Sequence, residues 1–111
     1  MGELMVVLSN APDAATAESL ARLLVEEGLA ACVHVLPGGL SFYEWEGSLH
    51  REGEWSMVIK TRAELYERLQ ARLAERHPYE VPEILGITVE RALPAYRDWL
   101  FGVTAKGRIA G

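Results

Sequence analysis

The fold is decided by LAACVHVLPGGLSFYEW at residues 29–45 and by EWSMVIKT at residues 54–61. Both runs are rich in β-branched and aromatic residues, which is typical of β-strands. A Pro-Gly-Gly sequence at residues 37–39 interrupts the first run, as a bend or a β-bulge would. The polar residues 46–53 between the runs indicate a turn. The sequence therefore predicts a long, bent β-hairpin over residues 29–61.

A strand and a helix are predicted before this hairpin, and a helix, a strand and a short helix are predicted after it. These assignments rest on hydrophobic periodicity and on the usual start and stop residues of helices. The predicted elements are a strand at residues 4–8, a helix from the turn at residues 9–13 to Gly28, a helix at residues 63–76, a strand at residues 84–89 and a helix at residues 93–100.

The order β-α-β-β-α-β, followed by a helix, predicts an α+β ferredoxin-like sandwich with both main helices on one face of an antiparallel sheet. We expect one domain over residues 1–101 and a flexible C-terminal tail over residues 102–111. Two helices cover only one face of a four-stranded sheet. The other face and the extended hairpin therefore need a cover, which predicts a homo-oligomer.

Composition narrows the class of protein. The chain has 111 residues, of which 50% are hydrophobic, and a net charge of −5, so a single globular domain without general affinity for nucleic acid is expected. No stretch approaches the length of a membrane-spanning helix, and we expect no membrane partner.

Cys32 is the one cysteine in the sequence, which fits a reducing compartment. The N-terminal apolar run lacks a preceding basic region, so a cytoplasmic location is expected.

The segment HPYEVPE at residues 77–83 carries an imidazole, a phenol and two carboxylates between and beside two prolines. Proline restricts its own backbone and that of the preceding residue, so the segment is stiff. It could hold side chains in fixed directions for a binding site, or it could serve only as a rigid connector between a helix and a strand. Both interpretations stay open on this segment alone.

Candidate metal ligands are few. Cys32 and His34 lie two residues apart on a predicted strand and share one face, although a small core residue and a partly buried polar one would look the same. No CxxC, HExxH or GxSxG motif occurs. The thiol lies in apolar surroundings, which makes it unreactive. We therefore expect no enzymatic activity and no required cofactor.

Several short motifs occur together in chain order. They are Leu29-Ala-Ala-Cys32, Pro37-Gly38, Ser41-x-Tyr43-x-Trp45-x-Gly47, Glu54 before an apolar run that ends Ile59-Lys60-Thr61, His77-Pro-Tyr79, Pro82-Glu83-Ile84 and Tyr96-x-x-Trp99. In this combination, over about residues 4–100, the chain resembles the CutA family of divalent-cation tolerance proteins. The resemblance implies a homotrimer in which the hairpin arms pair between subunits, with a fold and assembly similar to those of PII signalling proteins.

The resemblance also implies a role in tolerance of copper and other divalent cations. Carried over by position, it makes His77 the candidate ligand of Cu²⁺ or another divalent cation, with Cys32 and His34 as possible replacements for the other ligands. The matched residues expected in clefts between subunits are Tyr43, Trp45, Lys60, Tyr79, Glu83, Tyr96 and Trp99.

Three departures from the family put copper binding in doubt. His34 stands where the family usually has Asn, and Ser9 and Arg76 stand where some copper-binding relatives have Cys and His. The alternative is a PII-like scaffold that binds a small ligand or an unknown protein partner, with residues 46–53 as a mobile signalling loop.

Overall fold

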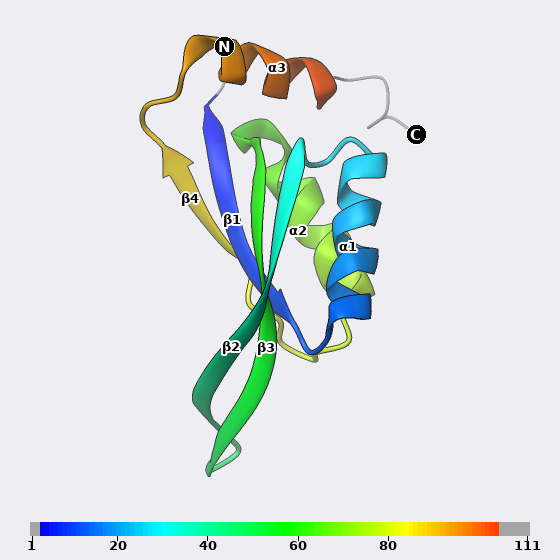
Figure 1. Ribbon diagram of the computed structural model, residues 1–111, viewed down its shortest axis with the longest axis vertical. Helices are drawn as coiled ribbons and strands as arrows, with labels where there is room; N and C mark the ends of the chain where they lie inside the picture. Colours follow the sequence, from blue (N-terminus) through cyan, green and yellow to red (C-terminus); the bar gives the residue numbers. More distant parts are fainter. Residues whose placement is uncertain (1–2, 105–111) are drawn as a thin grey trace.

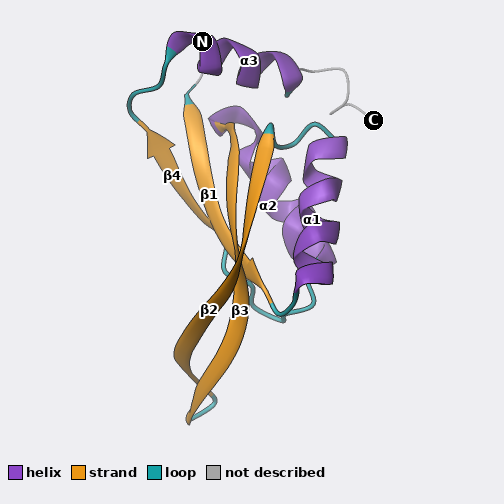
Figure 2. Cartoon of the chain, viewed as in Figure 1, coloured by secondary structure: helices purple, strands orange, loops and turns teal. Residues whose placement is uncertain are grey.

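The computed structural model describes residues 3–104. Its elements follow the predicted order (Figures 1 and 2): β1 (Leu4–Ala11), α1 (Ala14–Glu26), β2 (Cys32–Trp45), β3 (Ser48–Arg62), a 3-10 turn η1 (Ala63–Leu65), α2 (Tyr66–Arg76), β4 (Leu85–Val89) and α3 (Pro94–Val103).

The strands form one antiparallel sheet in the order β2-β3-β1-β4. Helices α1 and α2 pack on the same face of this sheet (Figure 1). The core between the helices and the sheet is made of fully buried side chains from both layers, among them Val7, Leu24, Ile59, Leu69 and Leu73. The predicted ferredoxin-like sandwich is therefore confirmed.

The opposite face of the sheet is open. Alternation along β4 puts Leu85 and Ile87 on this face, and they are 55% and 50% exposed. Helix α3 crosses one end of the sheet (Figure 1) and buries Leu100 against Leu4 and Ala31. It therefore covers the end of the sheet and leaves the rest of this face to solvent.

Strands β2 and β3 continue beyond the sheet as a two-stranded arm (Figure 1), which we define as residues 39–54. The predicted interruption is confirmed, because the register shifts between Leu36 and Gly39. At the tip, Glu46 and Gly47 have φ of 51° and 83°, as the favoured two-residue hairpin turn requires.

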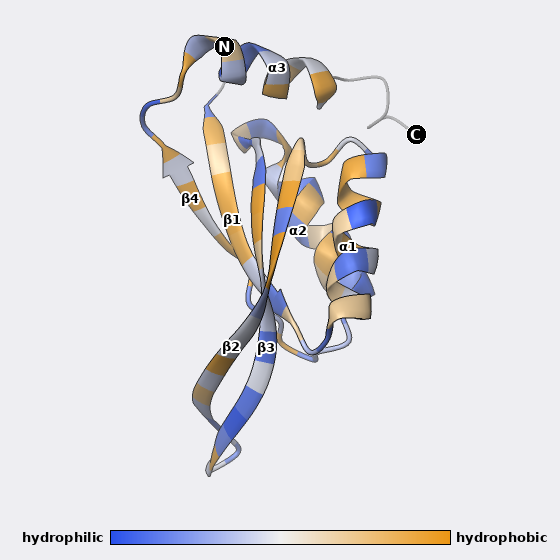
Figure 3. Ribbon diagram, in the orientation of Figure 1, coloured by the Kyte–Doolittle hydropathy of each residue, from blue (hydrophilic) through white to orange (hydrophobic). Residues whose placement is uncertain are grey.

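The structure of the arm shows that one prediction was wrong. Residues 46–53 were expected to form a loop, but Ser48 to Gly53 belong to β3 and pair with the arm segment of β2. The reason is that the β3 half of the arm has no buried face, so it carries mostly polar residues and lacks the apolar alternation that marks a sheet strand. Figure 3 shows this contrast, with apolar residues on the β2 half and hydrophilic residues on the β3 half.

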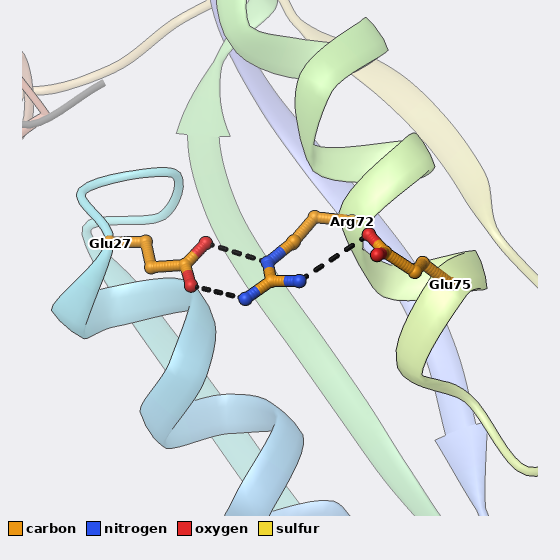
Figure 4. Close-up of polar contacts among 3 residues, drawn as sticks. All are labelled: Glu27, Arg72 and Glu75. Carbon is orange, nitrogen blue, oxygen red and sulfur yellow. Dashed lines mark hydrogen bonds and ion pairs between the residues drawn. The ribbon is translucent and has the colours of Figure 1, made fainter. Parts of the chain in front are cut away.

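An ion-pair cluster joins the two main helices (Figure 4). The Arg72 guanidinium donates through Nε and Nη2 to both carboxylate oxygens of Glu27, at 2.9 and 2.7 Å, and through Nη1 to Glu75 at 3.3 Å. These hydrogen bonds hold the pKa of Glu27 below its usual value. A forked, two-point contact fixes direction as well as distance, so it sets how α1 lies against α2.

Both ends of the final helix differ slightly from the prediction. The helix begins at Pro94 and continues to Val103, because Thr104 closes its last turn with backbone and side-chain hydrogen bonds to the Leu100 carbonyl. Gly102 and Val103 are therefore helical rather than part of a tail. Residues 105–111 of the predicted tail lie outside the described residues.

Candidate functional site

The loop between α2 and β4 meets the end of β1 and the base of the arm (Figure 1). His77 ends α2 with φ of −75° and ψ of 140°, the extended backbone that a residue before proline favours. The chain then turns, and Tyr79 and Glu83 face residues of β1 and β3. The stiff segment identified in the sequence thus forms one wall of a site.

Glu54 is the centre of this site. It pairs with Gly39 next to the bulge and is only 8% exposed. Its Oε1 accepts hydrogen bonds from Asn10 Nδ2 at 2.9 Å and Ser41 Oγ at 2.6 Å, and its Oε2 accepts one from the Tyr79 hydroxyl at 2.6 Å. All three contacts come from uncharged donors, and both oxygens of the carboxyl group act as acceptors.

The imidazole of His77 supports the loop and is also 8% exposed. Its Nδ1 accepts a hydrogen bond from the Tyr79 backbone N–H at 3.1 Å. Nε2 must therefore carry the proton, which it donates to the Asn10 carbonyl at 2.7 Å. Because both ring nitrogens are used within the chain, this side chain holds the loop against β1 and has no free lone pair for a metal ion.

The Glu54 groove lies beside this hydrogen-bonded cluster and has a volume of about 590 Å³. Glu54 and residues of the arm, of β1 and of the α2–β4 loop line it: Asn10, Ser41, Phe42, Tyr43, Trp45, Glu54, Pro78, Tyr79, Glu80, Val81 and Glu83. Burial and the hydrogen bond to Glu54 raise the pKa of Tyr79 well above its usual range. Burial and the charges of Glu52 and Glu54 also raise the pKa of Tyr43.

A second groove, of about 560 Å³, lies between the sheet and α3. Lys60 and Tyr96 line it, together with Arg91, and the Tyr96 ring lies 5.5 Å from that of Trp99. The seven residues predicted for clefts are therefore divided. Tyr43, Trp45, Tyr79 and Glu83 meet in the Glu54 groove, whereas Lys60, Tyr96 and Trp99 gather at or beside the second groove.

The three predicted metal ligands do not meet within one chain. Cys32 and His34 share the open face of β2, as predicted, and the Lys60 ammonium lies 4.0 Å from the Cys32 thiol. His77 contacts Asn10, further along β1. Among residues 3–104, no group of three or more His, Cys, Asp or Glu side chains is placed to hold a metal ion. The residues of a single chain thus do not fit a closed Cu²⁺ or Zn²⁺ site.

The sequence suggested Glu54 only as a carboxylate that could pair with Lys60 or hold a cation, and Asn10 and Ser41 were not predicted as site residues. Asn10 lies close to the start of α1 but does not cap it, because Asp13 caps α1 by accepting the Thr16 N–H at 2.8 Å. The one available signal was an acidic residue at the start of an apolar strand run, directly opposite the glycines of the bulge. Its partners are 13 to 44 residues away in sequence, so the cluster appears only in the folded chain.

No helix in the described part of the chain has the length and apolar character needed to cross a lipid bilayer.

Comparison with known proteins identifies the family. The family described as CutA1 divalent ion tolerance protein matches residues 5–102. The Divalent-cation tolerance protein CutA of Citrobacter koseri is 44% identical over 98 residues, which cover 88% of this chain and 85% of the relative.

Solved structures agree with this assignment. CutA from Xylella fastidiosa superimposes with a TM-score of 0.91 at 37% identity, covering 93% of this chain and 99% of that one. The protein named periplasmic divalent cation tolerance protein CutA from Archaeoglobus fulgidus superimposes with a TM-score of 0.89 at 33% identity, covering 92% and 99%. On this sequence and structural similarity, the chain belongs to the CutA1 divalent ion tolerance protein family.

Proposed function

We propose that this protein acts in divalent-cation tolerance as a cytoplasmic homotrimer that binds a ligand or a partner rather than catalysing a reaction. The observation that carries the proposal is the uncovered sheet face, together with the arm that continues from it. A fold that left both exposed as a monomer would present a contiguous apolar surface and free strand edges to water.

The chemistry of this surface supports self-association. Leu85 and Ile87 are at least half exposed on the open face, and Leu40 and Leu49 of the arm are 54% and 77% exposed. Each large apolar side chain gains roughly 1.5–3 kcal/mol when it is fully removed from water. A trimer in which each arm pairs with a neighbour would bury these side chains and close the strand edges in the same step.

The mass of the protein in solution tests the trimer. Light scattering at micromolar concentration should give three times the chain mass of 12.3 kDa. Ile87→Lys, which puts a charge on the open face, should give a lower mass. Val25→Lys is the matched control, because Val25 is 38% exposed on α1. A monomeric wild-type protein would overturn the trimer.

The tolerance function is tested by growth. A bacterium that has lost its own relative of this protein should regain growth on elevated copper when it expresses the wild-type chain. Expression of Ile87→Lys should not restore growth if the trimer is the active form. Equal growth with and without the wild-type chain would count against the function.

Direct binding of Cu²⁺ or another divalent cation would need ligands from more than one chain, since the predicted ligands of one chain lie apart. Calorimetric titration of the metal-free protein with Cu²⁺ and Zn²⁺ tests this. Binding at sub-micromolar concentration that is lost in His34→Ala and in Ile87→Lys would make the protein a direct metal binder. Weak, unsaturable binding would make tolerance an indirect effect of another ligand.

The Glu54 groove favours a second candidate function, a PII-like scaffold that responds to a small ligand. A signalling loop at residues 46–53 is no longer part of this candidate, because residues 48–53 are strand.

Cell fractionation tests the proposed cytoplasmic location. The single cysteine favours the cytoplasm, whereas the Archaeoglobus fulgidus relative carries the word periplasmic in its name.

A further inference from the structure

We infer that the Glu54 groove binds a small organic cation, with an ammonium or guanidinium head and a short apolar body. The inference rests on the second candidate function and deepens it by naming the class of ligand. Residues of a single chain build the groove, so the inference does not depend on the proposed trimer. It names a ligand class that neither the family name nor the predicted metal ligands supply.

The first argument is charge. Glu54 is 8% exposed, and its hydrogen-bond partners Asn10, Ser41 and Tyr79 are all uncharged. Glu80 and Glu83 also line the groove, and no lysine or arginine is among its described lining residues. A largely buried carboxylate is usually paired with a cation, and here the groove leaves the position of that cation open.

The second argument is the character of the walls. Tyr43 and Trp45 alternate with Ser41 along β2 and so share its side of the arm. They are 42% and 41% exposed in a groove that also holds the Tyr79 ring. Aromatic faces attract organic cations through the ring quadrupole. Walls of this kind around a carboxylate suit a cation with a carbon skeleton.

The third argument is an unsatisfied acceptor. Asn10 turns its Nδ2 towards both Glu54 and Glu83, at 2.9 and 3.3 Å, and its buried Oδ1 has no hydrogen-bond partner among the described residues. Buried polar atoms are nearly always paired in folded proteins. A donor-rich ligand that shifts this amide on entry would complete its hydrogen bonding, and ammonium and guanidinium groups carry only donors.

A bare metal ion fits the groove less well. Three hydrogen bonds already occupy the oxygens of Glu54, and a divalent ion would have to displace them to reach its usual six or more oxygen ligands. An organic cation can instead use the remaining lone pair of Oε2 while its body packs against Tyr43 and Trp45. The aromatic walls would contribute nothing to a metal site.

The test uses butylguanidinium as the probe and butylurea as its uncharged counterpart of nearly equal shape. Binding to the full-length wild-type protein is measured by calorimetry and by tryptophan fluorescence, since Trp45 lines the groove. We expect saturable binding of butylguanidinium with one site per chain, weakened by added salt. Butylurea should bind at least roughly tenfold more weakly, because it cannot form a charge-assisted hydrogen bond.

Two variants locate the site. Glu54→Gln should weaken butylguanidinium binding at least roughly tenfold. Trp45→Leu leaves the hydrogen-bonded cluster intact and should weaken binding roughly fivefold through the lost cation–π contact, so it serves if Glu54→Gln folds poorly. Glu18→Gln makes the same charge change at an exposed position of α1 and should leave binding unchanged.

A further probe distinguishes two sources of the cation, which are the side chain of a protein partner and a free small molecule. Tighter binding of acetyl-arginine-amide than of butylguanidinium would indicate the side chain of a protein partner, and the reverse would indicate a free small cation. Either result supports the inference.

Failure to bind any cation, equal binding of butylurea, or equal losses in Glu18→Gln and Glu54→Gln would overturn the inference. Binding to a monomeric Ile87→Lys variant but not to the wild type would overturn it as well, because a neighbouring chain would then fill the groove. The mass measurement is independent of all these outcomes, so a failed ligand and a failed trimer can be distinguished.

Discussion

At the scale of single residues, the loop segment at 77–83 serves as a connector and as a wall of the groove through different side chains. His77 uses both ring nitrogens to fasten the loop to β1. Tyr79 turns its hydroxyl to the Glu54 carboxylate. The two interpretations of the sequence are therefore compatible, because the imidazole provides the rigidity that lets the phenol face the groove in a fixed direction.

Tyr79 should make the protein sensitive to alkali. Its pKa in the folded chain is raised above the ordinary tyrosine value of 10, first by burial and then by Glu54. Above pH 10 the unfolded chain releases this proton while the folded chain keeps it, so the free energy of unfolding falls as pH rises. Tyr79→Phe should remove about 1.4 kcal/mol per pH unit from this slope, measured by urea unfolding between neutral and alkaline pH. An unchanged slope would show that Tyr79 ionises normally.

At the scale of elements, local pattern predicted the parts of the fold in which neighbouring residues decide the structure. Hydrophobic periodicity predicted α2, and Gly28, with φ of 74°, follows the end of α1 as predicted. The glycines of the bulge predicted the register shift of β2. The arm was missed in part because its strands lack a buried face. The Glu54 cluster was missed because hydrogen bonds between distant segments leave no periodic signal in the sequence.

Gly86 in β4 should be intolerant of a side chain. A Cβ at this position would lie 2.9 Å from Tyr66 Cε1 and 3.0 Å from Met5 Sδ, so α2 or β1 would have to move. We expect Gly86→Ala to lower the free energy of unfolding by about 1–3 kcal/mol. Gly53→Ala in β3 is the control, because a Cβ added there would have no neighbouring atom within 4 Å; its effect should be about 0.5 kcal/mol or less. Equal effects would refute the packing argument, and Tyr66→Leu should partly rescue Gly86→Ala.

The ion pair between α1 and α2 should make the stability of the protein depend on pH in the acid range. Arg72 lowers the pKa of Glu27, so this stabilisation is present above the ordinary glutamate pKa of 4.5 and is lost as pH falls through the lower folded value. Arg72→Met should lower the melting temperature at neutral pH and reduce the further drop on acidification. Arg68→Met, at an exposed position of the same helix, should keep the full acid dependence of the wild type. Identical acid profiles for all three proteins would contradict this role of the ion pair.

At the scale of the whole molecule, the arm makes the chain elongated, with principal extents of 45, 30 and 22 Å. A two-stranded ribbon alone is at best marginally stable in water, yet this arm supplies Ser41, Tyr43, Trp45 and Glu54 to the groove. The shape of the groove therefore depends on whatever holds the arm in place. Association through the open face would link the stability of the fold to the integrity of the groove.

If the protein is a trimer, its resistance to denaturant should rise with its concentration. Unfolding of one trimer releases three chains, so mass action favours the folded state by roughly 2.7 kcal/mol of trimer for each tenfold rise in chain concentration. Urea midpoints of the wild type should therefore increase steadily across a hundredfold range of concentration, whereas those of Ile87→Lys should stay constant. Reversibility is checked by refolding from urea at each concentration. A reversible wild-type midpoint that does not depend on concentration would mean that the open face stays exposed and that the arm is held by contacts within its own chain.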